Sequence, residues 1–200
     1  MATLVIGVTG KKRAGKDTFA RRLIEHHGFT RVAFADALKA VMSELDPVIP
    51  VHLDETGVVW GPGSEARWGT TRLKSLVTEV GWEKAKEVRE VRRLLQAHGD
   101  AIRRHTDPDI WVNAVRQQVG NTPGPVVLTD VRYPNEAEFI TENAGRLVRV
   151  VRGGQLLDDN HITETALDKW PVNAQVGNDG AVSALHAKAD ELVDYWYNHL

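Results

Sequence analysis

The stretch VIGVTGKKRAGKDTFA (Val5–Ala20) decides the fold, because an apolar run leads through a glycine-containing turn into residues with helical periodicity. Strand, loop and helix in this order form the context in which the pattern GxxxxGK, followed by Ser or Thr, binds phosphate. Backbone N–H groups of such a loop surround phosphate oxygens, and the helix N-terminus adds partial positive charge. The stretch therefore predicts a nucleotide site formed by Gly10, Lys12, Ala14, Gly15, Lys16, Asp17 and Thr18.

Asp17 departs from this pattern, since it stands where Ser or Thr normally offers a neutral oxygen to Mg²⁺, and Thr18 follows one position later. A carboxylate is also a hard oxygen ligand, although it adds negative charge beside the phosphates. Two arrangements stay open: Asp17 holds Mg²⁺ through water, or Thr18 supplies its hydroxyl to a neighbouring phosphate. A strand-to-helix turn with surface lysines is the non-functional alternative.

Short apolar segments alternate with helical patterns along the chain. Such an alternation predicts an α/β fold with right-handed crossovers, a P-loop NTPase-like three-layer sandwich whose parallel sheet of about five strands is flanked by helices. Apolar side chains at helical spacing indicate that the C-terminal segment packs on this sheet. The expected strands lie at residues 3–8, 31–36, 125–130, 146–152 and 173–178.

The middle of the chain interrupts this alternation. Residues 46–71 are rich in Pro and Gly and indicate an irregular segment. Residues 81–105 predict a long polar helix, or two helices separated near Gly99. We therefore expect a single domain over residues 1–200, with a core at about 1–45 and 106–200 and a helical acceptor-binding lobe at about 46–105. A short lid is expected at about 152–165.

Composition narrows the classes of function. The chain has no cysteine, which excludes disulfides and thiolate catalysis and fits a reducing compartment. The formal net charge of −2 argues against binding of a nucleic-acid polymer by the whole surface. The first residues lack the features of a signal peptide, and no apolar stretch is long enough to span a membrane. We therefore expect a cytoplasmic protein without membrane partners.

Six short motifs follow one another in order. Together they resemble the deoxynucleoside monophosphate kinases of tailed bacteriophages, over about residues 4–168. The resemblance implies ATP and Mg²⁺ as cofactors, a deoxynucleoside monophosphate as acceptor, and the cytoplasm of the host cell as location. It also implies a working phosphate loop, because GKDT ends the loop in that family too. The motifs are GKDT (Gly15–Thr18), FADALK (Phe34–Lys39), LLQAHGDAIR (Leu94–Arg103), DPDIWV (Asp107–Val112), DVRYPNEAE (Asp130–Glu138) and DNHITE (Asp159–Glu164).

Phosphoryl transfer requires positive charge and positioning rather than covalent chemistry, so cationic residues near the loop are the catalytic candidates. Lys16 is expected to reach the β- and γ-phosphates. Arg152 opens a Gly-Gly loop and is expected to close over the phosphates as a lid arginine; Arg149 is a weaker candidate, and a solvated strand end is the alternative. Arg132 is expected to clamp the acceptor phosphate. Asp130 is expected to hold Mg²⁺ through water or to orient Arg132, and a purely structural pairing of the two is the alternative.

The remaining candidates concern the acceptor. The family resemblance places Asp36 beside the acceptor phosphate and metal, where it would accept a proton, and a helix N-cap is its rival role. For Trp68, base stacking and core packing are equally open. In the lid loop, ordering of the loop or contacts with ribose and phosphate are favoured over zinc binding. The predicted acceptor-binding residues are Asp36, Lys39, Trp68, Arg72, Gln96, Arg103, Asp130, Arg132, His161 and Glu164.

Other functions compatible with the loop are a small-molecule kinase of the dephospho-coenzyme-A type and a P-loop NTPase that drives a partner. A nucleotide-binding module without catalysis is a further alternative, with Asp17 as the lesion. Small size and the lack of a basic stripe argue against the NTPase. A homodimer is open, and the helix at 88–105 is the first surface to test for it.

Overall fold

The computed structural model describes residues 4–54, 57–58, 67–153 and 165–199. They form two compact units: Met1–Ala35 with Trp111–Leu200, and Asp36–Ile110. The first unit contains the phosphate-loop stretch, and helix α2 (Phe34–Leu45) begins in it and continues into the second unit. No described helix is long and apolar enough to cross a membrane.

The first unit is built on a five-stranded sheet in the order β2-β6-β1-β7-β8, with every neighbouring pair parallel. The central strand β1 carries the phosphate loop at its carboxyl end, which is where ligands of open α/β sheets bind. The predicted parallel sheet is therefore confirmed. The strands are β1 (Val5–Thr9), β2 (Thr30–Val32), β6 (Val126–Leu128), β7 (Arg146–Val151) and β8 (Ala174–Gly177).

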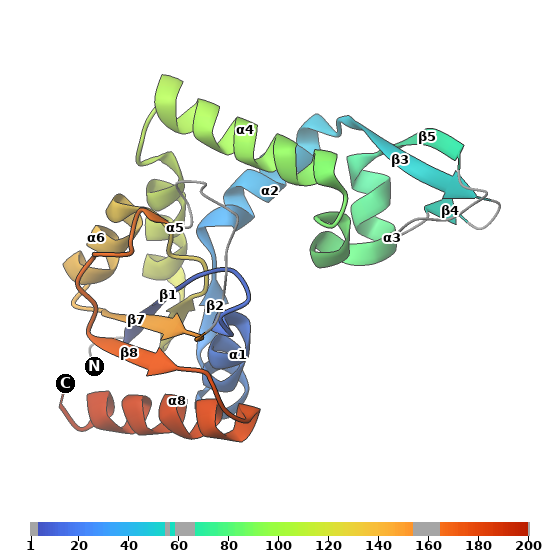
Figure 1. The fold of residues 1–200 in the computed structure, drawn as a ribbon. Helices are drawn as coiled ribbons and strands as arrows, with labels where there is room; N and C mark the ends of the chain where they lie inside the picture. The colour runs from blue at the N-terminus through green and yellow to red at the C-terminus, as the bar shows by residue number, and fades with distance from the viewer. Residues whose placement is uncertain (1–3, 55–56, 59–66, 154–164, 200) are drawn as a thin grey trace. The chain divides into compact units, whose positions relative to one another are not determined.

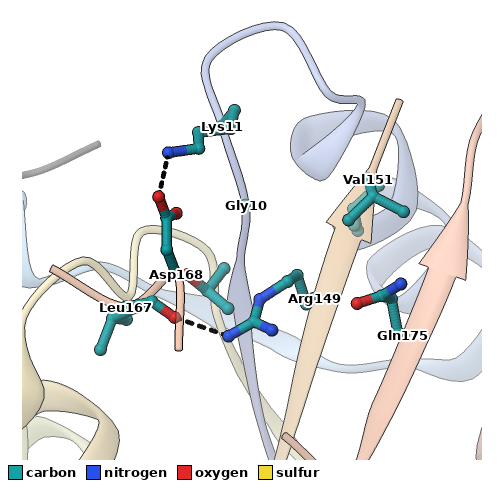
Figure 2. Close-up of a pocket in the computed structure, with 9 residues that line it drawn as sticks. Gly10, Lys11, Arg149, Val151, Leu167, Asp168 and Gln175 are labelled. Atoms are coloured by element: carbon teal, nitrogen blue, oxygen red, sulfur yellow. Dashed lines mark hydrogen bonds and ion pairs between the residues drawn. The ribbon is translucent and has the colours of Figure 1, made fainter. Parts of the chain in front are cut away.

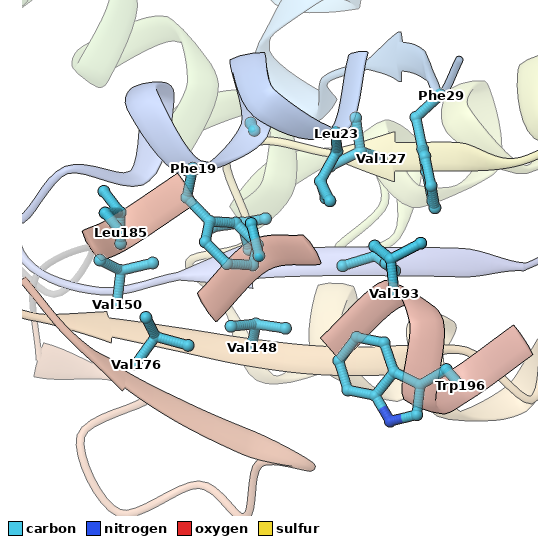
Figure 3. Packing of buried hydrophobic residues seen from close by; sticks show 14 of the residues in the cluster. Phe19, Leu23, Phe29, Val127, Val148, Val150, Val176, Leu185, Val193 and Trp196 are labelled. Atoms are coloured by element: carbon cyan, nitrogen blue, oxygen red, sulfur yellow. The ribbon is translucent and has the colours of Figure 1, made fainter. Parts of the chain in front are cut away.

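Helices cover both faces of this sheet (Figure 1). On one face lie α1 (Lys16–His27) and α8 (Val182–Tyr197), and on the other α5 (Ile110–Asn121) and α6 (Pro134–Glu142). The layer under α1 and α8 is apolar throughout, and Figure 3 shows Phe19 of α1 and Trp196 of α8 among the valines of the strands. On the opposite face α6 lies so close to β1 that a Cβ on Gly7 would be 2.8 Å from Ile140.

A charged cluster joins α1 to α8 beyond the apolar layer. Arg22 donates from Nε and Nη2 to the two carboxylate oxygens of Asp190, at 2.8 and 2.7 Å. His27 Nε2 lies 2.8 Å from the same carboxylate. Such a bidentate arginine–carboxylate pair is stronger than an ordinary surface ion pair. Arg22 holds the pKa of Asp190 well below its usual value, chiefly by hydrogen bonding.

Asp190→Asn is expected to lower the free energy of unfolding by about 1 kcal/mol at neutral pH. Because the folded pKa is depressed, the carboxylate stabilises the fold above the unfolded pKa of about 3.8 and stops doing so as pH falls through the folded value. The difference in free energy of unfolding between the parent chain and the variant should therefore decrease below about pH 4. Urea unfolding across pH measures it, with Asp194→Asn, exposed on the same helix, as control. A gap independent of pH would contradict the assignment.

The second unit is not purely helical, which corrects the expectation for this lobe. It contains an antiparallel three-stranded sheet in the order β4-β3-β5, made of β3 (Val48–Asp54), β4 (Gly57–Val58) and β5 (Arg67–Arg72). The same unit also contains helices α3 (Leu73–Ala85) and α4 (Arg89–His105). Met42, Ile49 and Leu76 belong to a separate buried core. The described part of the segment predicted to be irregular is thus mainly β-structure, in which β3 and β5 pair as the two long strands of a hairpin.

Two boundaries differ from the prediction by more than two residues. The second strand ends at Val32, and residues 34–36 start α2, because Asp130 binds the N-terminus of that helix, as described below. The long polar helix divides at residues 86–88 rather than near Gly99. Gly99 is buried inside α4, where a Cβ would be 3.0 Å from Leu38, so it allows close helix packing.

Candidate phosphate site

The loop after β1 has a backbone that requires glycine at two positions. Gly10 has a φ of 139° and Gly15 a φ of 104°, a region that residues with a Cβ rarely adopt. A Cβ on Gly10 would lie 2.2 Å from the carbonyl oxygen of Val150. The loop is therefore pressed against the neighbouring strand β7, which fixes the place where β1 turns toward α1.

Lys16 is the first residue of α1, and its side chain folds back over the loop. Its ammonium donates to the carbonyl oxygens of Gly10 at 2.7 Å and Lys11 at 2.8 Å. The side chain is buried, with 9% of the residue exposed. An ammonium held at the mouth of the loop by backbone carbonyls is positioned to exchange them for phosphate oxygens, which are stronger acceptors because they are charged.

The N-terminus of α1 has no side-chain cap. Its N-cap is Gly15, which has no side chain to accept from the first N–H groups. The first N–H groups of a helix have no intrahelical partner and carry partial positive charge, so together they form an anion site. Asp17 is exposed, whereas Lys12 and Thr18 are half-buried. The predicted residues thus lie in the connection from β1 to α1 and in the first turn of α1.

A pocket of about 260 Å³ lies beside the loop, on the sheet face opposite α1. Figure 2 shows Lys11 pointing to Asp168, with which it forms an ion pair at 2.7 Å. The side chain of Arg149 extends from β7 toward Leu167 and donates to the carbonyl oxygens of Leu167 and Trp170. Arg149 thus holds the turn at residues 165–170, so a structural role accounts for this weaker lid candidate.

Asp130 lies at the carboxyl end of β6 and binds the start of α2. Its two carboxylate oxygens accept from the backbone N–H groups of Phe34 and Ala35, both at 2.9 Å. A carboxylate at a helix N-terminus satisfies unpaired N–H groups and interacts favourably with the helix dipole. This contact was not predicted from the sequence, where Asp130 was assigned to Mg²⁺ or Arg132. Water-mediated binding of Mg²⁺ by Asp130 stays a prediction.

Asp130→Asn is expected to destabilise the fold by about 1–2 kcal/mol, because the amide keeps one acceptor and loses the charge that faces the helix. Urea unfolding measures this change. The Mg²⁺ dependence of activity, measured on the same variant, separates the capping role from a metal role. Equal stability of variant and parent would contradict the cap.

A hydrogen bond to its backbone N–H holds Arg132 in place. Its N–H donates at 2.7 Å to the carboxylate of Glu136, which also accepts from the N–H of Tyr133 at 3.1 Å. Glu136 is 1% exposed and lies in the first turn of α6. Glu136 fixes the backbone that carries the half-buried Arg132 side chain. It was not predicted as a site residue, although a Glu in the first turn after Pro134 is a sequence signal of a helix start.

Arg152 directly follows β7 and is exposed, at the same edge of the sheet as the phosphate loop. His161 and Glu164, predicted in the lid loop, lie outside the described residues. The structure therefore places the predicted lid arginine at the end of the strand next to the loop, and its contact with phosphate stays a prediction.

Six predicted acceptor residues belong to the second unit: Asp36, Lys39, Trp68, Arg72, Gln96 and Arg103. Asp36 lies in the first turn of α2 and accepts at 3.1 Å from Lys39, one turn later. Arg72 donates to the carbonyl oxygen of Asp46, at the base of the hairpin. Gln96 and Arg103 lie on α4 and are half-buried.

Trp68 is 74% exposed, so core packing of this residue is excluded. Its ring lies edge-to-face on His52 of the paired strand, with ring centroids 4.0 Å apart. An exposed indole supported by a neighbour presents a face on which a base could stack.

The family model for deoxynucleotide monophosphate kinase matches residues 67–189. A protein of Acanthamoeba polyphaga mimivirus, named as a candidate deoxynucleotide monophosphate kinase, is 30% identical over 174 residues, which cover 82% of each chain. The deoxynucleotide monophosphate kinase of Escherichia phage RB69 is 30% identical over 108 residues, 52% of this chain and 44% of that protein. Among solved structures, TT1252 from Thermus thermophilus aligns over 98% of both chains with 16% identity and a TM-score of 0.49.

Proposed function

Because the chain belongs to the deoxynucleotide monophosphate kinase family, we propose that it transfers the γ-phosphate of ATP to a deoxynucleoside 5′-monophosphate. The products are ADP and a deoxynucleoside diphosphate. The observation that carries this function is the loop itself. Lys16 is held at the mouth of a turn whose glycines and glycine-capped helix N-terminus suit the phosphates of a nucleotide.

The chemistry asks mainly for positive charge on the transferring group and for alignment of donor and acceptor. Lys16 neutralises charge that develops on the β- and γ-phosphates. Arg152, at the end of β7, closes over the same group, and Arg132 binds the acceptor phosphate with its forked donors. Placement of Arg132 by the buried Glu136 supports this role, because a fixed backbone lowers the cost of orienting the side chain.

The second unit supplies the acceptor site in this proposal. Asp36 accepts the proton or orients the acceptor phosphate, with Lys39 as its charge partner. Trp68 stacks on the base, and Gln96 offers a donor and an acceptor to its edge. Arg72 and Arg103 add positive charge for the monophosphate. His161 and Glu164 contact ribose or phosphate from the lid at 152–165.

The oxygen donors at the loop fit Mg²⁺, which would neutralise phosphate charge when bound. Asp17 and Thr18 lie in the first turn of α1 and offer a carboxylate and a hydroxyl, and Asp130 offers its carboxylate through water. The proposal further includes action in the cytoplasm, which is that of the host cell if the protein is phage-encoded, with no polymeric nucleic acid as substrate. Self-association through α4 also stays a prediction.

The test is ADP formation from Mg-ATP with each deoxynucleoside monophosphate in turn, with ribonucleotides and a reaction without acceptor as controls. Turnover that depends on a deoxynucleotide is the expected result and gives the base specificity directly. Turnover with dephospho-coenzyme A or another small molecule alone would move the activity to a different acceptor. Hydrolysis without acceptor would overturn the kinase and favour an ATPase.

A further inference from the structure

We propose that Asn178, which directly follows β8, is a positioning residue for the phosphate loop: its side-chain amide orients the Gly15 N–H toward the nucleotide. The Nδ2 of Asn178 donates to the carbonyl oxygen of Ala14 at 2.8 Å, across 164 positions of sequence. Its backbone N–H donates to the carbonyl oxygen of Val151 at 2.7 Å, so the residue is anchored to the end of β7. Asn178 thus connects the loop with the strand that leads to Arg152.

The geometry of one peptide group carries the argument. The described residues contain no cis peptide bond, so the peptide group between Ala14 and Gly15 is trans. In a trans peptide the C=O and N–H bonds lie in the same plane and point in opposite directions. A hydrogen bond that fixes the carbonyl therefore fixes the direction of the N–H. Gly15 is the N-cap of α1, and its N–H directly precedes that of Lys16. Holding the Ala14 carbonyl therefore directs the Gly15 donor away from Asn178.

Asn178 also determines which residue fits at position 15. A Cβ on Gly15 would lie 2.2 Å from the Nδ2 of Asn178, at a φ of 104°. The amide therefore occupies the space that a side chain at this position would need. The glycine of the motif serves this contact as well as the approach of phosphate.

A purely local role for the amide is poorly supported. The N-cap of α8 is Ala181, so Asn178 does not cap the helix that follows. The neighbouring residues have their own contacts: Lys188 donates to the carbonyl oxygen of Gly177 at 2.7 Å, and Asp179 accepts from the N–H of Gly153 at 2.6 Å. These bonds hold the turn on both sides of Asn178, which leaves its side chain to the phosphate loop.

The inference rests on the proposed function only in taking a nucleotide as ligand, so the test measures binding of Mg-ADP by calorimetry and needs no acceptor. Asn178→Ala removes the donor and is expected to weaken ADP binding about tenfold, the equivalent of one oriented hydrogen bond. Asn178→Asp keeps the shape without the donor and is expected to weaken it at least as much. In the kinase assay, KM for ATP should rise while KM for the deoxynucleotide stays within about twofold.

The matched control is Asn173→Ala. Just before β8, the side-chain oxygen of Asn173 accepts from the N–H of Leu147 at 2.7 Å, so its loss removes one side-chain–backbone hydrogen bond of an asparagine away from the loop. This control should lower the melting temperature and leave ADP affinity unchanged. Unchanged affinity in both Asn178 variants, equal loss in the control, or no ADP binding by the parent chain would overturn the proposal. ADP binding without deoxynucleotide turnover would overturn only the proposed function.

Discussion

Lys16→Ala is expected to lower kcat by about a thousandfold, because Lys16 supplies positive charge to the transferring phosphate. Removal of one preorganised charge or donor from the transition state costs 10² to 10³ in rate in other enzymes. The Lys16 ammonium is buried and held by two loop carbonyls, so water replaces it poorly. Initial rates of ADP formation at saturating ATP and acceptor measure the loss.

Two companion variants make this result specific to Lys16. Lys16→Arg keeps the charge but is also expected to lose at least a hundredfold, since the planar guanidinium does not reproduce a compact ammonium inside the loop. Lys169→Ala removes an exposed lysine of the same unit and should leave kcat unchanged. A loss below about tenfold in Lys16→Ala would remove this residue from the mechanism.

Gly10→Ala is expected to destabilise the fold by about 3–5 kcal/mol, the largest effect on stability proposed for a single methyl group here. Two costs combine: a φ of 139°, which an L-residue rarely adopts, and a Cβ placed 2.2 Å from the carbonyl oxygen of Val150. The obstacle is backbone of the sheet interior, so relief requires a shift of β1 or β7. Equilibrium unfolding in urea measures the change.

Gly28→Ala separates these two costs. Gly28 ends α1 with a φ of 68°, and a Cβ there would meet nothing within 4 Å. The control is therefore expected to lose only about 1 kcal/mol, the cost of a left-handed residue without a clash. Equal losses in the two variants would mean that the contact with Val150 contributes nothing.

The parallel sheet and the phosphate loop could be predicted because their signals are local. Apolar runs mark buried strands, and the spacing of Gly10, Gly15 and Lys16 identifies the loop without reference to distant residues. The hairpin of the second unit was missed, because β5 (Arg67–Arg72) is mostly exposed and has little apolar patterning. Its strands are recognised only once they pair with β3.

The supporting contacts of the site were missed for a different reason. Asp130 binds the N-terminus of α2 across 95 positions, and Asn178 binds the loop across 164. No periodicity in the sequence connects residues so far apart, because the contact exists only after the strands have assembled. A sequence therefore reveals the groups that touch phosphate more readily than the groups that hold them in place.

The pairing of α1 with α8 has a consequence for synthesis of the chain on the ribosome. Helix α1 carries Lys16 of the site, yet α8, the helix that packs beside it on the same face of the sheet, begins only at Val182. While translation proceeds, the apolar layer around Phe19 and Leu23 lacks Leu185, Val193 and Trp196. Nascent chains that expose such surface are prone to aggregate. An mRNA truncated before the codons of α8 should therefore yield insoluble protein, although it encodes the whole phosphate loop.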